Sequence, residues 1–153
     1  MNPLTRFIKE KNPDRRVATQ AFRQVFAGMF AAQFGIALLT ALLVILLAGV
    51  QARPSPLGPT LAGLSVLQLL LGLIVPEMVA GGSGKGPVLS ALLLSSVILA
   101  GSSWTLMLAV VTGQEFLHLA IIGFMMANAY LLGFLQAGRL AAKATRREPQ
   151  EPA

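Results

Sequence analysis

The chain has 153 residues, of which 55% are hydrophobic and only 12% are charged, and its net charge is +6. Soluble domains carry about 25% charged residues, so this composition, with a mean hydropathy of +0.71, argues against a soluble protein. The absence of cysteine excludes a disulfide framework and thiol chemistry. The positive charges gather beside apolar stretches at the two ends of the chain, which indicates contact with a membrane surface rather than with nucleic acid.

Residues 1–24 are predicted to form a basic, amphipathic, cytoplasmic segment. Asn2-Pro3 and Asn12-Pro13 both match a helix start, with asparagine at the cap and proline at the first helical position. Leu4, Phe7 and Ile8 share one face of the first helix, as in helices that lie among lipid headgroups. Five cations are expected to contact anionic headgroups of the cytoplasmic leaflet: Arg6, Lys9, Lys11, Arg15 and Arg16. The alternative is a solvated tail, because so short a helix is marginal without a partner.

Four stretches without charge are each long enough to cross a bilayer. A hydrocarbon core of about 30 Å needs about 20 apolar residues of helix. Spans are expected at about residues 25–50, 57–76, 87–111 and 116–138. The second helix start should run straight into the first span, whose apolar stretch is too long for the core of a cleaved signal peptide. The predicted fold class is an all-α integral membrane protein, with a four-helix transmembrane bundle and an N-terminal cytoplasmic amphipathic helix.

Residues 80–87 are expected to form a flexible turn between the second and third spans. The glycines around Lys85 resemble a phosphate loop, but Val79 occupies the place of the first required glycine, and Gly86 that of the serine or threonine. Nucleotide binding is therefore rejected. Pro76 predicts either a kink near the end of the second span or its last turn. Residues 139–153 are expected to form a tail that is basic at first and then disordered.

The distribution of Lys and Arg predicts the orientation in the membrane. Cytoplasmic segments carry an excess of these residues. With four spans and both termini inside, eleven of them lie on the cytoplasmic face and only Arg53 lies on the outer face. An odd number of spans would place one basic end outside. We therefore expect an N-in/C-in protein of a bacterial-type cytoplasmic (inner) membrane.

The ionisable residues near the spans are the first candidates for function, because charge inside a membrane is costly. Glu77 is expected at the cytoplasmic end of the second span, and Glu115 at the outer start of the fourth, with His118 one turn further in. A Glu-x-x-His pair shares a helix face and can serve a metal site or a proton sensor. A metal would need further carboxylates, and no other span offers one at this depth. No catalytic, cofactor or metal site is predicted.

Uncharged polar residues inside the spans form a second group of candidates. Gln33, Gln68 and Asn128 lie in the first, second and fourth spans. The third span is rich in hydroxyl groups: Ser90, Ser95, Ser96, Ser102, Ser103 and Thr105. Hydrogen bonds between membrane helices are worth about 0.6–2 kcal/mol each.

Small residues at four-residue spacing predict close helix contacts. They form three rows: Ala27, Ala31 and Gly35; Gly123 and Ala127; and Ala129, Gly133 and Ala137. The last two rows give the fourth span more than one packing face, so that one could meet a neighbouring subunit or partner; the alternative is that all of the small residues serve packing within the chain. We therefore expect a non-enzymatic subunit, assembly factor or scaffold that acts through helix packing, as a homo-oligomer or in a larger complex. The alternative is an oligomeric transporter or channel for a small solute, in which the polar residues share one cavity.

Overall fold

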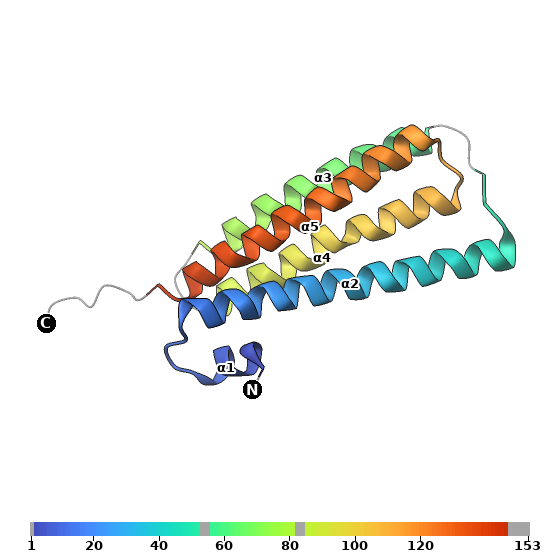
Figure 1. Ribbon diagram of the computed structural model, residues 1–153. Coiled ribbons are helices and arrows are strands. Elements are labelled where there is room, and N and C mark those ends of the chain that lie inside the picture. The colour runs from blue at the N-terminus through green and yellow to red at the C-terminus, as the bar shows by residue number, and fades with distance from the viewer. Residues whose placement is uncertain (1, 53–55, 82–84, 147–153) are drawn as a thin grey trace, which may run out of the picture.

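The computed structural model describes residues 2–52, 56–81 and 85–146. Over these ranges it contains five helices and no strand (Figure 1): α1 (Pro3–Lys9), α2 (Arg15–Ala48), α3 (Leu57–Val79), α4 (Lys85–Val111) and α5 (Phe116–Ala144). Helices α2 to α5 are each long and apolar enough to cross a membrane, which confirms the predicted fold class. The tail residues 147–153, for which disorder was predicted, lie outside the described residues.

The four long helices run side by side, so the bundle has two ends (Figure 1). One end, here called the basic end, holds α1, the starts of α2 and α4, and the ends of α3 and α5. Helices α4 and α5 contact each other, and each also contacts both α2 and α3, whereas α2 and α3 do not touch over the described residues. The α4–α5 pair therefore forms the centre of the bundle, with α2 and α3 on opposite sides.

Helix α1 begins as predicted, and α2 begins slightly later than predicted. The Asn2 side chain accepts a hydrogen bond from the Leu4 amide at 3.1 Å, and proline follows Asn2 at the first helical position. The predicted start at Asn12 was wrong, because the cap of α2 is Asp14, whose side chain accepts from the Arg16 amide at 3.5 Å. A carboxylate at this place both accepts a free amide and meets the positive end of the helix dipole.

The long helices match the predicted spans, with shifted ends. Helix α2 continues without a break through the expected entry point at residue 25 and ends at Gly49, whose φ of +73° suits glycine. Helix α3 continues three residues past Pro76, which therefore lies inside the helix. Helix α4 begins at Lys85, and α5 continues past residue 138, so that Arg139 and Lys143 are helical and not part of a tail.

Helix α4 is the most buried of the four long helices, and its closest contacts with neighbouring helices are made by Leu99. The Leu99 side chain is fully buried. A Cβ atom added to Gly72 of α3 or to Gly133 of α5 would collide with Leu99, and at Gly133 it would also collide with Phe26 of α2. The two glycines thus let α3, α5 and α2 approach α4 closely, as small residues do between membrane helices.

We predict that Gly133→Ala destabilises the bundle by about 1–3 kcal/mol, because overpacking forces neighbouring side chains to move. The matched control is Gly123→Ala in the same helix, where an added Cβ meets nothing within 4 Å. Thermal unfolding in mild detergent, followed by circular dichroism, should show a lower Tm for the first variant only. Equal Tm values for the two variants would contradict this account of the packing.

Candidate functional site

The structure places the predicted ionisable residues at opposite ends of the bundle. Glu77, near the end of α3, forms an ion pair with Lys143 of α5 at the basic end. Glu115 is the exposed N-cap of α5 at the other end, and its side chain makes no capping hydrogen bond. No group of three His, Cys, Asp or Glu side chains that could hold a metal occurs among the described residues.

His118 packs against α3 and is not held in a pair with Glu115. A Cβ atom added to Gly58 of α3 would lie 2.6 Å from His118 Nδ1 and 2.7 Å from Gln114 Oε1. His118 Nδ1 is buried and has no hydrogen-bond partner among the described residues. The ring therefore fills the space that glycine leaves at the start of α3, which is a packing contact between α3 and α5.

The three amide side chains predicted as polar candidates lie in separate parts of the bundle and do not bond to one another in the described chain. Thr105 Oγ1 of α4 donates to Gln68 Oε1 of α3 at 2.9 Å, so this pair joins two helices. The amide nitrogen of Asn128 donates to the carbonyl of Phe124 in its own helix at 2.8 Å. Gln33 lies half-buried on α2. The described bonds of Gln68 and Asn128 therefore do not converge on one cavity.

A buried polar cluster joins α3, α4 and α5. Ser95 Oγ of α4 lies 2.7 Å from Gln136 Oε1 of α5 and 3.2 Å from the carbonyl oxygen of Gly72 in α3, and its one proton can serve either acceptor. Gln136 Nε2 donates to the carbonyl of Leu73 at 2.7 Å. Gln136 and Ser95 are 0% and 1% exposed. We call these four residues the Ser95 cluster.

Pro76 explains why the Ser95 cluster exists. In a regular helix the amide of residue 76 would bond to the carbonyl of Gly72, but proline has no amide hydrogen. A buried carbonyl without a donor is costly in a membrane, where water is absent. The Ser95 hydroxyl is within reach of the Gly72 carbonyl, and the Gln136 amide donates to the next carbonyl, that of Leu73. The cluster thus stabilises a proline-containing turn of α3.

Gln136 was missed among the sequence candidates. Gln136 lies close to Arg139, near the end of the predicted fourth span, where a polar side chain is expected to face the membrane surface rather than another helix. The sequence nevertheless indicated that a buried donor is needed, because Pro76 has no amide hydrogen for the carbonyl of Gly72. Gly72, Ser95 and Gln136 each lie about 11–15 Å along their helices from the basic end, so they were at matching depth.

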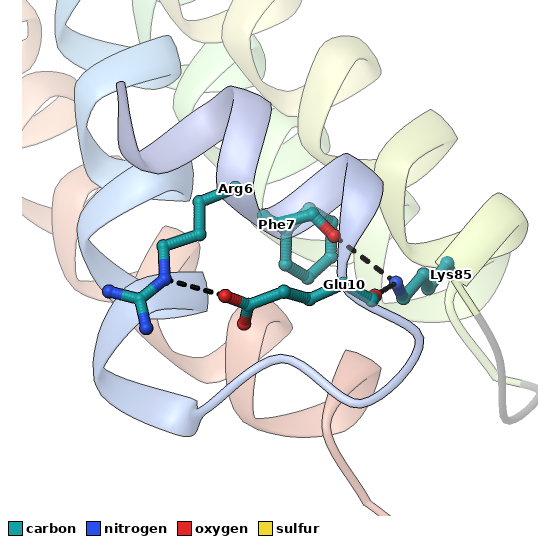
Figure 2. Close-up of polar contacts among 4 residues, drawn as sticks. All are labelled: Arg6, Phe7, Glu10 and Lys85. Atoms are coloured by element: carbon teal, nitrogen blue, oxygen red, sulfur yellow. Dashed lines mark hydrogen bonds and ion pairs between the residues drawn. The ribbon is translucent and has the colours of Figure 1, made fainter. Parts of the chain in front are cut away.

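Helix α1 folds back onto the bundle. Phe7 is fully buried, and its ring meets Phe22 of α2 edge to face with centroids 5.2 Å apart. Lys85 Nζ, at the start of α4, donates to the carbonyls of Phe7 at 3.1 Å and Glu10 at 2.7 Å (Figure 2). It also lies 5.0 Å from the centre of the Phe7 ring. The apolar face of α1 is therefore partly used by the bundle, whereas Ile8 is 63% exposed.

The five cations predicted to contact lipid headgroups are exposed at the basic end. Arg6 forms an ion pair with Glu10 within the same segment (Figure 2), and this carboxylate raises the pKa of the Arg6 guanidinium. Contact of these residues with lipid stays a prediction.

A groove of about 440 Å³ between α2 and α5 at the basic end gathers further cations. We call it the basic groove, and it is lined by Arg15, Thr19 and Arg23 of α2, by Leu135, Gly138, Arg139, Ala142 and Lys143 of α5, and by Arg146, which follows α5. The described residues that line it include five cations and no acid. It is joined along α2 by a recess of about 660 Å³ that also reaches Ala27 and Phe134.

The basic groove is the arrangement in the described chain best suited to bind a ligand. Arg and Lys donors suit phosphate or carboxylate groups, and arginine can bind such groups through two parallel hydrogen bonds. Lys143 already pairs with Glu77. Arg15, Arg23, Arg139 and Arg146 therefore contribute most of the positive field in the groove.

Comparisons with known protein families, with curated proteins and with solved structures found no match to this chain.

We predict that Gln136→Leu lowers the stability of the bundle by about 1–2 kcal/mol, because the carbonyl of Leu73 loses its donor and Ser95 loses an acceptor. Asn128→Leu is the matched control in the same helix, since that amide bonds only to its own helix among the described residues. Its stability should change by less than about 0.5 kcal/mol. Chemical unfolding in mixed micelles measures both, and a larger loss for Asn128→Leu would refute the role assigned to the Ser95 cluster.

Proposed function

We propose that this protein is a non-enzymatic membrane subunit, assembly factor or scaffold that acts by packing against a neighbouring membrane protein, either a second copy or a different chain. The observation that carries the proposal is the division of small residues on α5. Ala129, Gly133 and Ala137 are buried against the rest of the chain. Gly123 has open space where a Cβ would stand, and Ala127 is exposed, so this row offers a second close-packing face.

Helix α2 supports the same proposal. Its contacts with the bundle are made by larger residues such as Phe26 and by Ala37 and Ala41, which are buried. In the predicted row of small residues on α2, Ala31 and Gly35 are exposed, and a Cβ atom added to Gly35 would meet nothing within 4 Å. Small residues in a lipid-facing position let another helix approach closely, and this is how many membrane helices associate.

The polar residues favour this proposal over the transporter alternative. A solute path would need polar groups that face a common cavity. Here Gln68 accepts a hydrogen bond from Thr105. Ser95 bonds to Gln136, which in turn donates to a carbonyl of α3. The Asn128 amide donates to a carbonyl of its own helix. All of these bonds except that of Asn128 hold helices together, which is what a packing protein requires.

The proposal includes an N-in/C-in orientation in a bacterial-type inner membrane. Its support is that all ten Lys and Arg residues of the described ranges lie toward the basic end of the bundle. Positive residues are retained on the cytoplasmic side during insertion.

The absence of cysteine permits a direct test of orientation. Single cysteines at Lys11 and at Ala52, which are exposed at opposite ends, serve as reporters. A membrane-impermeant maleimide should label Ala52→Cys in spheroplasts, and should label Lys11→Cys only after lysis. The reverse pattern would overturn the proposed orientation.

The packing function predicts a complex that depends on the Gly123 face. In mild detergent the wild-type chain should run above its monomer mass of 16.1 kDa, as measured by light scattering and native mass spectrometry. Gly123→Leu should shift it to the monomer, because a bulky side chain blocks the close approach of another helix.

The matched control is Gly63→Leu on α3. Gly63 also has no contact within 4 Å, and it lies at a similar distance from the opposite end as Gly123. The control should keep the wild-type mass. A wild-type protein that is strictly monomeric and partner-free in mild detergent and in nanodiscs would refute the proposal.

A further inference from the structure

We propose that the basic groove binds the phosphate of an anionic phospholipid, whose acyl chains extend along the apolar part of the groove toward Phe134 and Leu135. This inference rests on the membrane placement in the proposed function, but it needs no protein partner. It differs from diffuse attraction between surface cations and headgroups, because it assigns one site between two helices, with a defined set of donors.

The charge of the groove fits a phosphate. Arg15 and Arg23 line it from α2, Arg139 and Lys143 from α5, and Arg146 from the residues that follow α5. Among the described residues, the acids nearby are Glu77, Asp14 and Glu10. Glu77 is paired with Lys143 and Glu10 with Arg6, and Asp14 lines the adjoining recess and caps α2. Basic pockets between transmembrane helices at the cytoplasmic side are typical sites for phospholipid headgroups.

Arg23 is held in place before any ligand binds. Its guanidinium carbon lies 4.8 Å from the centre of the Phe134 ring. A Cβ atom added to Gly138 would lie 3.1 Å from Arg23 Nη2, so the guanidinium rests where this glycine leaves room. Arg23 Nε is buried and has no hydrogen-bond partner among the described residues. A fixed, stacked guanidinium without a carboxylate partner is well suited to bind a phosphate.

The order of residues along α2 favours a lipid over a soluble phosphate. Arg15, Thr19, Arg23 and Ala27 follow one another at four-residue spacing, so they share one face that changes from charged to apolar with depth. On α5 the same change runs from Lys143 and Arg139 to Leu135, which is 47% exposed. A phospholipid has this polarity, with a charged headgroup above apolar chains.

The test compares phosphatidylglycerol with phosphatidylcholine on the delipidated full chain. Native mass spectrometry and the lipid-dependent rise in Tm should both show that phosphatidylglycerol binds at least about tenfold more tightly. Arg23→Gln should weaken binding of phosphatidylglycerol about tenfold or more, because a charge-assisted hydrogen bond is lost. Lys9→Gln removes the same charge from α1, outside the groove, and should change binding less than about twofold.

Gly138→Leu keeps every charge but occupies the space of the Arg23 guanidinium, and Arg23→Lys keeps the charge but loses the planar donor group. Both should also weaken phosphatidylglycerol binding, and circular dichroism will show whether each variant stays folded. These two variants keep the proposal testable if Arg23→Gln does not fold.

Three results would overturn the proposal. The first is an equal loss of affinity in Lys9→Gln and Arg23→Gln, which would indicate diffuse attraction. The second is unchanged binding in folded Arg23→Gln or Gly138→Leu protein. The third is stabilisation by inorganic phosphate as large as that by phosphatidylglycerol, which would identify a soluble ligand. The mass measurements that test the packing function are independent of all three.

Discussion

The carbonyl groups that precede Pro76 set the main constraint on this bundle. In the bilayer interior no water can satisfy the carbonyl of Gly72, which Pro76 deprives of its helical donor, so a donor must come from a neighbouring helix. Ser95 of α4 and Gln136 of α5 both reach the same turn of α3. This requirement fixes the depth of three helices relative to one another, because a shift by one residue along a helix axis is about 1.5 Å and would break the bonds.

The close packing around Leu99 lies beside these hydrogen bonds. Gly72 contributes both its carbonyl oxygen, within reach of Ser95, and its missing side chain, which gives room to Leu99. Gly133 gives room to Leu99 and to Phe26, so α2 is also held against this region. Apolar attraction between helices is weak in lipid, and shape and hydrogen bonds decide how they associate. In this protein the close packing and the hydrogen bonds between helices lie at neighbouring positions.

The sequence was sufficient for what depends on hydropathy and local caps. It predicted the four spans, the uninterrupted passage into α2 and the start of α1 at Asn2. It did not predict that Phe7 would be buried, because the back-folding of α1 depends on contacts outside that helix. These are the Phe22 ring of α2 and Lys85, which lies 75 or more residues away from the carbonyls that it binds. Gln136 and Arg23 were missed for a related reason: their surroundings come from other helices, whereas hydropathy describes each segment alone.

The lack of contact between α2 and α3 has a consequence for the order in which the protein assembles. These two spans leave the ribosome before α4 and α5, and they share no packing surface over the described residues. They can be held together only after α4 and α5 have entered the bilayer between them. The hydrogen bonds that Lys85 donates to Phe7 and Glu10 must also wait until Lys85 has been synthesised. The N-terminal half of the chain therefore stays loosely organised in the membrane until the C-terminal half arrives.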